Sequence, residues 1–498
     1  MNKSILKYLT IILLVSACTE LEEEMFSSLS GDQFPENEDQ INLTIQEPFA
    51  DLRQIGNHDR WAAAQIATGD LLVVPTRAGD WGDGGEWVNM YRHTWTSNST
   101  RGVDDVWEFY QGITKCNEKI EFLNSLEETE ASLRAIARMK VLRAYFYWQI
   151  IDCYGDVPYV TSFINAPAMP EKTPRAVIFD SLTTDLTNVI QYFDDEPNKV
   201  LTDKFTAFAL LAKLYINSEV YTGTPRWDIA GQYCDSVIAG PYSLESNRLA
   251  PFAVENQNST ENIFTIPYDE DNYEGFFWHK ATLHYNLPAK YQAQTDFWNG
   301  WSATPYLFSL FEDADVRKQG LLYGPQYTSA GEPIIDNNTG TQVNLNPEIP
   351  ALIMDASFSE ADIKQSGARF VKFEVKKGVR FHASNDFPIF RLADFILMKA
   401  ECELRKPNGD IGIATDLVNQ IREAARTSPL APAQLNLDEL LEERARELYI
   451  EGHRRNDLIR FGKFGDARWE KPADDNPELR KTFPIPQIAV DANPNLKN

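Results

Sequence analysis

Tryptophan, aspartate and glycine lie close together in one stretch of the sequence, residues 70–100, which reads DLLVVPTRAGDWGDGGEWVNMYRHTWTSNST. Asp80, Trp81, Asp83 and Trp87 alternate there with glycines, which free the backbone to form turns. A turn this rich in tryptophan is expected to leave some of its rings exposed. An exposed ring offers a flat apolar surface and a neighbouring carboxylate accepts hydrogen bonds, so the stretch is a candidate ligand platform.

A second aromatic cluster, with Trp278, Trp298 and Trp301, lies in residues 243–388, where Pro, Gly, Asn and aromatic residues dominate. A long irregular insertion is uncommon in a compact domain unless it carries function. Sugars combine apolar C–H faces with polar edges, so rings beside acids suit a neutral glycan. The candidate glycan-binding residues are Asp80, Trp81, Asp83, Trp87, Trp278, Trp298 and Trp301. Each tryptophan on its own could equally belong to the core, which is the prediction for Trp95, Trp107 and Trp148 beside helical periodicity.

Other chemistries are less well supported by the sequence. Asp80, Asp83 and Glu86 could offer carboxylates to a structural calcium ion, but their spacing is not that of an EF-hand loop and favours an ordinary turn. The six histidines are scattered, so we expect no transition-metal site and no cofactor. A glycosidase needs two carboxylates facing each other across a sugar, and among 73 acidic residues some pair always qualifies on paper.

The densest run of charges, at residues 437–462, reads LDELLEERARELYIEGHRRNDLIRFG. Leucine and alanine recur in it at helical spacing, which predicts a packed helix followed by a shorter one at 454–461. Gly452 is expected at the positive φ that ends the first helix. A buried charge without a partner costs several kcal/mol, so these side chains must be paired. We interpret the run as a structural network and not as a catalytic site.

The elements that position these residues are mostly α-helical. Helical periodicity predicts hairpins that resemble a tetratricopeptide (TPR) solenoid, a scaffold over about 40–240 and 388–465 that is interrupted by the insertion at about 243–388. The expected helical stretches are 42–69, 103–126 with 131–154, 175–193 with 204–221, and 392–404 with 411–426. Short strands are expected at 263–268 and 369–373.

Residues 1–17 have the pattern of a lipoprotein signal peptide, in which lysines precede a short apolar run and small residues precede Cys18. Cys18 is the expected lipidation site, because two or more acyl chains anchor a protein stably to a membrane. The acidic residues 18–30 are expected to form a flexible tether before a single domain at 31–498. The other four cysteines, Cys116, Cys153, Cys234 and Cys402, are predicted to be buried free thiols. A net charge of −26 disfavours nucleic acid and polyanionic partners.

Five blocks of the sequence, in order, resemble the SusD/RagB family of outer-membrane lipoproteins. They are WEFYQGI at 107–113, RAYFY at 143–147 with YGDVP at 154–158, FRLAD at 390–394, the charged run at 442–462, and FPIPQ at 483–487 with NPNL at 493–496. The chain departs from the family pattern at Arg455 and Asn456, where many members carry an aromatic pair.

The resemblance implies a right-handed superhelix of about four TPR-like helix pairs, with the insertion and loops forming the ligand face. It also implies a cell-surface, outer-membrane protein of the Bacteroidota type that is no enzyme. Such a protein binds oligosaccharide or polysaccharide and delivers it to a SusC-like TonB-dependent transporter. Acidity and tryptophan content favour a neutral polymer such as a β-glucan. A surface glycoside hydrolase and a peptide-capture protein of the RagB type remain the alternatives.

Overall fold

The computed structural model describes Pro35 and residues 37–497. It is mostly helical with small two-stranded sheets, as the sequence predicts. The signal peptide at 1–17, Cys18 and the tether at 18–30 lie outside the described residues. Within the described part of the chain, none of the helices has both the length and the apolarity needed to cross a membrane.

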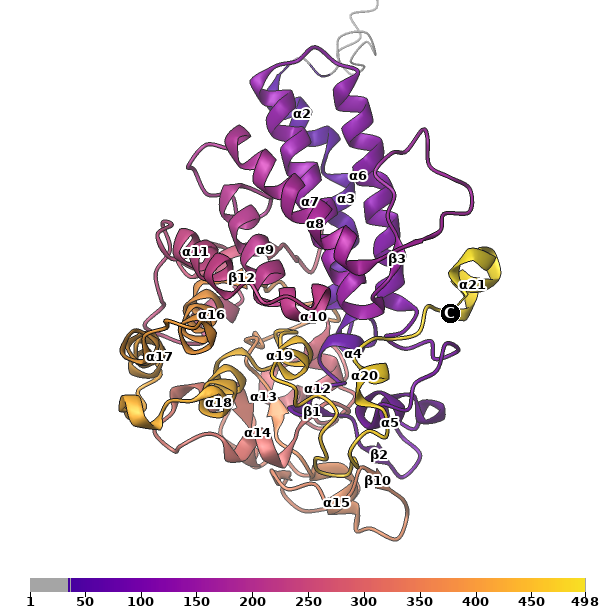
Figure 1. Ribbon diagram of the computed structural model, residues 1–498. Coiled ribbons are helices and arrows are strands. Elements are labelled where there is room, and N and C mark those ends of the chain that lie inside the picture. Colours follow the sequence, from indigo (N-terminus) through magenta and orange to yellow (C-terminus); the bar gives the residue numbers. More distant parts are fainter. Residues whose placement is uncertain (1–34, 36, 498) are drawn as a thin grey trace, which may run out of the picture.

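Helices α6 (Phe109–Asn124) and α7 (Glu130–Tyr154) form the long hairpin expected from the sequence (Figure 1). Thr129 begins α7 with a capping box, in which the Thr129 and Ser132 side chains each accept the other residue's backbone N–H (3.1 and 2.9 Å). Gly112 allows the two helices to approach closely, because a Cβ there would lie 2.4 Å from the Phe146 ring. The chain leaves α7 at Gly155, whose φ of +76° favours glycine.

The other long helices follow the α6–α7 hairpin along the chain. They are α8 (Arg175–Val189), α9 (Lys204–Ile216), α11 (Trp227–Ile238), α16 (Leu392–Arg405), α17 (Ile411–Ala424) and α18 (Leu437–Leu448), with the shorter α10 (Ser218–Thr222) and α19 (Arg454–Arg460). The sequence reading pairs α8 with α9, but α9 packs more extensively along α11, and α11 in turn along α16. The sequence reading omitted α11, although Ala230, Cys234 and Val237 make a buried stripe on it.

The N-terminal stretch is broken and not one helix over 42–69. It consists of α2 (Glu38–Thr44), α3 (Glu47–Ala50), a 3-10 turn (Asp51–Gly56) and α4 (Trp61–Gln65). Pro48 starts a new helix because it has no N–H to continue α2. Gly56 ends the 3-10 turn where its N–H donates to the Tyr268 hydroxyl (2.8 Å), a contact that the local sequence does not reveal.

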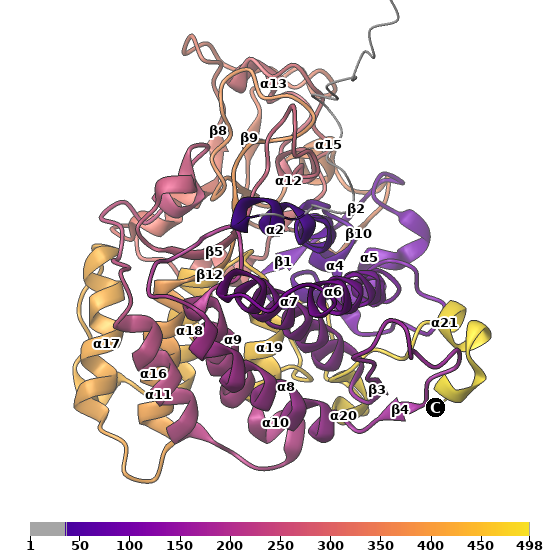
Figure 2. The same cartoon turned by 90° about the horizontal axis from the view of Figure 1, so that it is seen from above.

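The insertion begins and ends in one antiparallel pair, β5 (Asn262–Ile266) with β12 (Phe387–Arg391). The other pairs are β1 (Leu72–Val73) with β6 (Ser302–Ala303), β2 (Thr76–Arg77) with β10 (Ile353–Met354), β7 (Leu321–Leu322) with β11 (Arg369–Phe370), β8 (Gly324–Pro325) with β9 (Asn344–Leu345), and β3 (Val157–Pro158) with β4 (Lys172–Thr173). Short helices α12 (Trp278–Thr282), α13 (Pro288–Tyr291), α14 (Pro305–Ser309) and α15 (Glu360–Gln365) lie between the strands. In Figure 2, α13, β8 and β9 project on the side opposite α10, α11 and α16.

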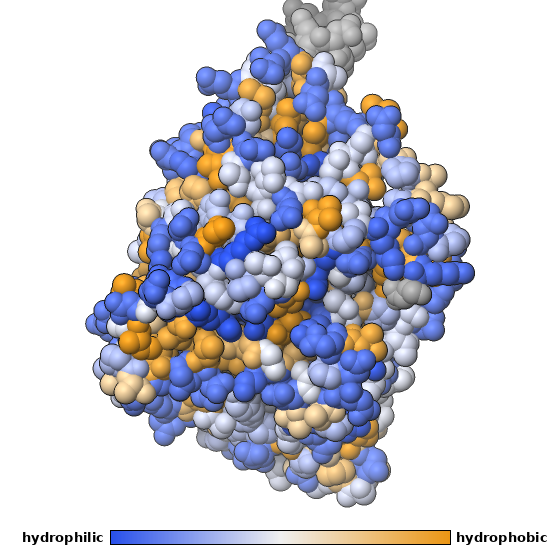
Figure 3. All heavy atoms as spheres, in the orientation of Figure 1, coloured by the Kyte–Doolittle hydropathy of each residue, from blue (hydrophilic) through white to orange (hydrophobic). Residues whose placement is uncertain are grey.

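The expected strands at 263–268 and 369–373 correspond to β5 and β11, whereas β12 is an addition. Three further short helices complete the fold, α5 (Glu86–Arg92), α20 (Pro477–Arg480) and α21 (Gln487–Ala492). The face seen in Figure 3 is mostly hydrophilic with separate apolar patches. The four cysteines of the described chain are buried free thiols, as predicted.

Most charges of α18 and α19 are buried and paired, many of them with partners from other parts of the chain, whereas Asp438 and Glu442 of α18 keep exposed side chains. Glu443 accepts from Arg317 (2.7 Å), which belongs to the insertion. Arg460 donates to Glu401 of α16 (2.8 Å). Because the partners come from both the insertion and the helices, the network fastens the insertion to the helical scaffold.

The departure at Arg455 and Asn456 has a structural explanation. Both side chains donate to the carboxylate of Asp152 on α7, at 2.7 Å each. A buried polar contact to α7 therefore occupies the place where the sequence resemblance leads us to expect an aromatic pair. Gly452, at φ +83°, lies against Trp61, and a Cβ there would be 2.0 Å from the indole.

Candidate functional site

Trp81 lies on a turn that follows β2. Trp81 and Asp83 adopt left-handed backbone conformations, with φ of 56° and 36°, which are uncommon for residues other than glycine. Arg77 holds the base of the turn, because its backbone N–H donates to the Asp80 carbonyl (2.8 Å). Its buried guanidinium donates to Ser302 Oγ (2.9 Å). The backbone and the side chain of Arg77 therefore hold the turn in place.

Trp298 lies on the segment that joins α13 to β6. Its Nε1 donates to Asp296 Oδ2 (3.1 Å), and the Lys280 ammonium lies 4.7 Å from the centre of its ring. The following residue, Asn299, accepts hydrogen bonds from two nitrogens of the buried Arg369 (2.7 and 3.2 Å). Trp298 is thus held in place by its neighbours on both sides.

Three contacts join the two tryptophan segments. Trp81 Nε1 donates to the Trp298 carbonyl (2.6 Å). The Trp81 indole packs on the backbone at Gly300, where a Cβ would come within 2.3 Å of the ring, so only glycine permits this contact. The guanidinium groups beneath the two segments share Ser302 Oγ as an acceptor, at 2.9 Å each. Residues far apart in the sequence thereby form one rigid platform.

The platform borders an open hollow of about 310 Å³. Its lining consists of His58, Asp59, Asp80, Trp81, Asp83, Arg101, Tyr285 and Trp298. The His58 ring lies between the two tryptophans, with its centre 5.2 Å from that of Trp298 and 5.8 Å from that of Trp81. Burial lowers the pKa of His58 to about 4, so its imidazole is neutral at pH 7.

The carboxylates of the hollow are paired with side chains around them. Arg101 donates to Asp59 Oδ2 (3.1 Å) and Asp83 Oδ2 (3.4 Å), and the Tyr285 hydroxyl donates to Asp80. Burial, followed by the nearby Asp80 carboxylate, raises the pKa of Tyr285, which keeps this hydroxyl protonated. Among the residues that the structure describes, no group of three metal-ligating side chains could hold a metal ion. The calcium hypothesis for this loop therefore has no structural support.

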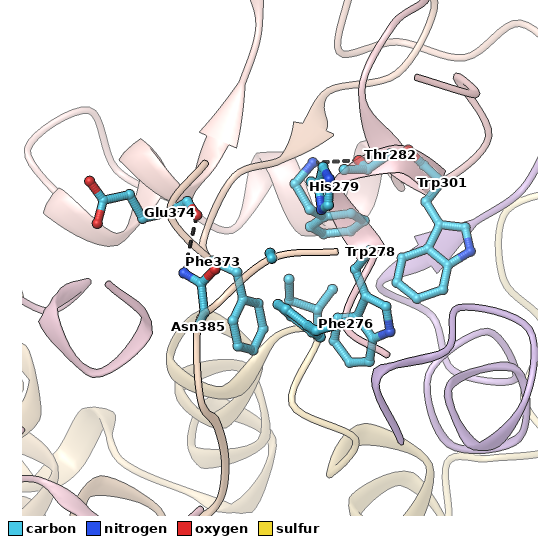
Figure 4. A pocket seen from close by; sticks show the side chains of 11 residues that line it. Phe276, Trp278, His279, Thr282, Trp301, Phe373, Glu374 and Asn385 are labelled. Atoms are coloured by element: carbon cyan, nitrogen blue, oxygen red, sulfur yellow. Dashed lines mark hydrogen bonds between the residues drawn. The ribbon is translucent and has the colours of Figure 1, made fainter. Parts of the chain in front are cut away.

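The structure brings together four of the seven candidate residues, Asp80, Trp81, Asp83 and Trp298. The other three, Trp87, Trp278 and Trp301, are only 1, 3 and 1% exposed. Trp278 and Trp301 line an interior cavity of about 20 Å³, together with Phe276 and Phe373 (Figure 4). Trp87 lies beneath the hollow and donates from Nε1 to Asp83 Oδ2 (3.0 Å). These three buried indoles can support a binding surface from beneath, but none exposes a ring face that a ligand could contact.

The sequence reading missed four residues of the hollow, His58, Asp59, Arg101 and Tyr285. His58 and Asp59 precede α4 and looked like part of a helix, and Arg101 follows the tryptophan stretch without any motif. Tyr285 is one of 20 tyrosines. No local signal distinguishes these residues, because only the tertiary fold brings them to one place.

Comparison with known proteins agrees with this architecture. Residues 260–498 match the SusD family, and residues 88–205 match a family described as starch-binding associating with outer membrane. The chain belongs to the SusD family. The starch-binding protein SusD of Bacteroides thetaiotaomicron is 26% identical over 430 residues, which span 77% of this chain and 75% of that protein. SusD-like protein P2 of Formosa agariphila is 22% identical over 94% of this chain and 90% of that protein.

Solved structures of this family share the fold. Surface glycan-binding protein A from Bacteroides thetaiotaomicron, in complex with laminarihexaose, has a TM-score of 0.72 at 19% identity and covers 92% of this chain and 98% of that one. A laminarin-binding SusD-like protein has a TM-score of 0.71 at 20% identity, with the same coverage of each chain. The fold expected from the sequence resemblance is therefore confirmed. The SusD family's glycan-binding proteins are non-catalytic.

Proposed function

We propose that this protein binds a neutral polysaccharide, such as a β-glucan, at the cell surface through the hollow between Trp81 and Trp298. The observation that carries the proposal is the pairing of these two partly buried indoles, each tied by its Nε1 to the protein, with carboxylates and Arg101 around them. Rings held in this way can cover the C–H faces of a sugar, and the polar side chains can take its hydroxyl groups. Of the proteins with the same fold, one is solved in complex with laminarihexaose and another binds laminarin.

The charges of the hollow favour a neutral ligand. Three acids, Asp59, Asp80 and Asp83, surround a single arginine, Arg101, which is already paired with two of them. A sulfated or uronic polymer would bring more negative charge next to these carboxylates and to a chain of net charge −26. Electrostatic repulsion would oppose its binding, whereas a neutral chain meets no such penalty.

The proposed role includes delivery of the glycan to a SusC-like TonB-dependent transporter in the outer membrane, with anchoring through acylated Cys18. The match to a family associated with the outer membrane supports this location. Metabolic labelling with a fatty acid should mark the native protein and not the Cys18→Ser variant. Purification of the lipidated protein in mild detergent should bring a TonB-dependent barrel with it, and its consistent absence would count against the transporter role.

Affinity electrophoresis in gels containing laminarin, barley β-glucan, starch or alginate tests the ligand. We expect retardation by a neutral polymer and none by alginate. Trp298→Ala and Trp81→Ala should each weaken binding by roughly tenfold, because about 1.4 kcal/mol is one factor of ten and a covered ring contributes about that much. Tyr192→Ala, which removes an aromatic side chain 39% exposed elsewhere, is the matched control and should bind normally. Retardation only by alginate, or unchanged binding in both tryptophan variants, would overturn the proposal.

A further inference from the structure

A second and larger cleft, of about 520 Å³, shares no lining residue with the Trp81–Trp298 hollow. It lies between α18 and α19 on one side and α14 and the loop at 463–469 on the other. Its volume falls within the range of roughly 300–1,000 Å³ that is typical of small-molecule sites.

The cleft repeats the construction of the first site. Trp469 is partly buried at the tip of a tight turn in which Arg468 and Lys471 exchange backbone hydrogen bonds (2.9 and 3.0 Å). Arg77 and Asp80 form the same kind of bridge next to Trp81. Arg468, like Arg77, is drawn into the protein, where it donates to the carbonyls of Thr68 and Tyr91 (2.8 and 2.7 Å). In each case an arginine that points into the protein holds a turn in place, and a tryptophan at that turn lines the neighbouring hollow or cleft.

The walls of the cleft combine rings and polar groups. Trp469 meets Tyr91 edge-on, with ring centres 6.2 Å apart, and Tyr306 of α14 lines the cleft as a partly buried ring. Glu442 of α18 is 41% exposed, and within the described part of the chain it forms one ion pair, with Arg446 at 3.7 Å. The Glu442 carboxylate is thus available to a ligand beside apolar ring surfaces.

The charges of the cleft largely cancel. Asp70 and Arg454 form a bidentate pair at its floor (2.7 and 2.8 Å), and Asp438 lies 3.4 Å from Lys463 at its rim. Neither a polyanion nor a polycation would find a uniform field in it. A neutral polyhydroxyl ligand needs what remains, which is ring faces for its C–H surface and separated donors and acceptors for its hydroxyls.

From this construction we infer a second carbohydrate-binding site, in which Trp469 and Tyr306 contact the sugar rings and Glu442 accepts their hydroxyl hydrogens. The inference rests on the proposed glycan-binding function and adds a second contact for the same polymer. The β1–β6 ladder shows where the cleft and the Trp81–Trp298 hollow lie relative to each other. Asp70 and Thr304, at one end of the ladder, border the cleft, and Gly300, beyond the other end, supports Trp81.

A few strand residues at about 3.3 Å each separate the two ends of that ladder, so a single polymer chain is long enough to reach both sites. Engagement of both sites by one polymer would raise its apparent affinity without any new contact, through the high effective concentration of the second site. A short oligosaccharide that fills one site would gain no such advantage.

Affinity electrophoresis in laminarin, barley β-glucan and starch gels, on the full mature chain, separates the two sites. In the Trp81→Ala/Trp298→Ala background we expect weak residual retardation, which the further change Trp469→Ala should abolish. Trp469→Ala alone should weaken binding of the polymer at least threefold and leave laminarihexaose affinity for the hollow unchanged by calorimetry. Residual retardation that persists unchanged in the triple variant, or its complete absence in the double variant, would refute the second site.

A measurement on the native protein avoids any dependence on variant folding. With 5-fluorotryptophan incorporated, the fluorine resonance of Trp469, assigned from Trp469→Phe, should shift when laminarihexaose is added at concentrations above those that saturate the Trp298 resonance. A Trp469 signal that stays fixed would overturn the inference while the Trp298 shift upheld the proposed function. If the native protein binds none of the neutral polymers, the proposed function fails and the second site fails with it.

Discussion

Replacing Arg391 with methionine should destabilise the protein by about 3–5 kcal/mol, the usual cost of removing one partner from a buried ion pair. Arg391 ends β12 and is 1% exposed. Its guanidinium donates to both carboxylate oxygens of Glu451 (2.5 and 2.7 Å), to Glu261 (2.7 Å) and to Glu447 (2.8 Å). All three glutamates are at most 2% exposed, so methionine would leave buried carboxylates short of cationic partners.

Arg380→Met is the matched control. Arg380 also contacts two acids, Glu270 (3.1 Å) and Asp271 (2.6 Å), but its side chain is 41% exposed, and exposed pairs contribute at most about 1 kcal/mol. Equilibrium urea unfolding followed by tryptophan fluorescence measures both variants. If Arg391→Met lies within about 1 kcal/mol of the control, the buried network contributes no more than surface pairs do.

Two further predictions concern acid stability and the platform. Burial alone would raise the pKa of Glu443, but Arg317, Arg446 and Arg422 together lower it to about 2. Its contribution is therefore complete above pH 4.5 and is lost as the pH falls from about 4.5 to 2, which amounts to about 3 kcal/mol, and Glu443→Gln should flatten the urea-unfolding free energy over this interval. Gly300→Ala should lower glycan affinity without global unfolding, because the new Cβ displaces the Trp81 indole. Unchanged retardation in polysaccharide gels would show that the position of that ring does not matter.

The helical scaffold was predictable because its signal is local. In α7 and α18 apolar side chains recur on one face, and the caps at Thr129 and Asn436 stand directly before the helices in the sequence. The break in the N-terminal stretch was less accessible, since Gly56 ends its helical turn through a contact with Tyr268, 212 residues away. Helix α11 was not predicted, although Ala230, Cys234 and Val237 recur at helical spacing in the sequence.

The candidate site was predictable by composition but not by residue. Aromatic and acidic content pointed to the two segments that line the hollow. The same content does not distinguish Trp298, which borders the hollow, from Trp301, which is 1% exposed. Exposure depends on which distant segments pack together, and a sequence window contains no such information. His58 and Arg101 join the site for the same reason, through tertiary proximity alone.

The charged run at 437–462 connects the helical scaffold with the candidate site. Its buried glutamates bind Arg317 and Arg248 of the insertion, so a segment with few regular elements is fixed to the helices by ion pairs. The same device recurs under the platform, where two buried arginines meet at Ser302 Oγ. A binding surface formed by loops needs such support, because ring faces must stay in place for a ligand to gain from them. Charge pairing in the interior is therefore what allows irregular backbone to present a rigid aromatic surface.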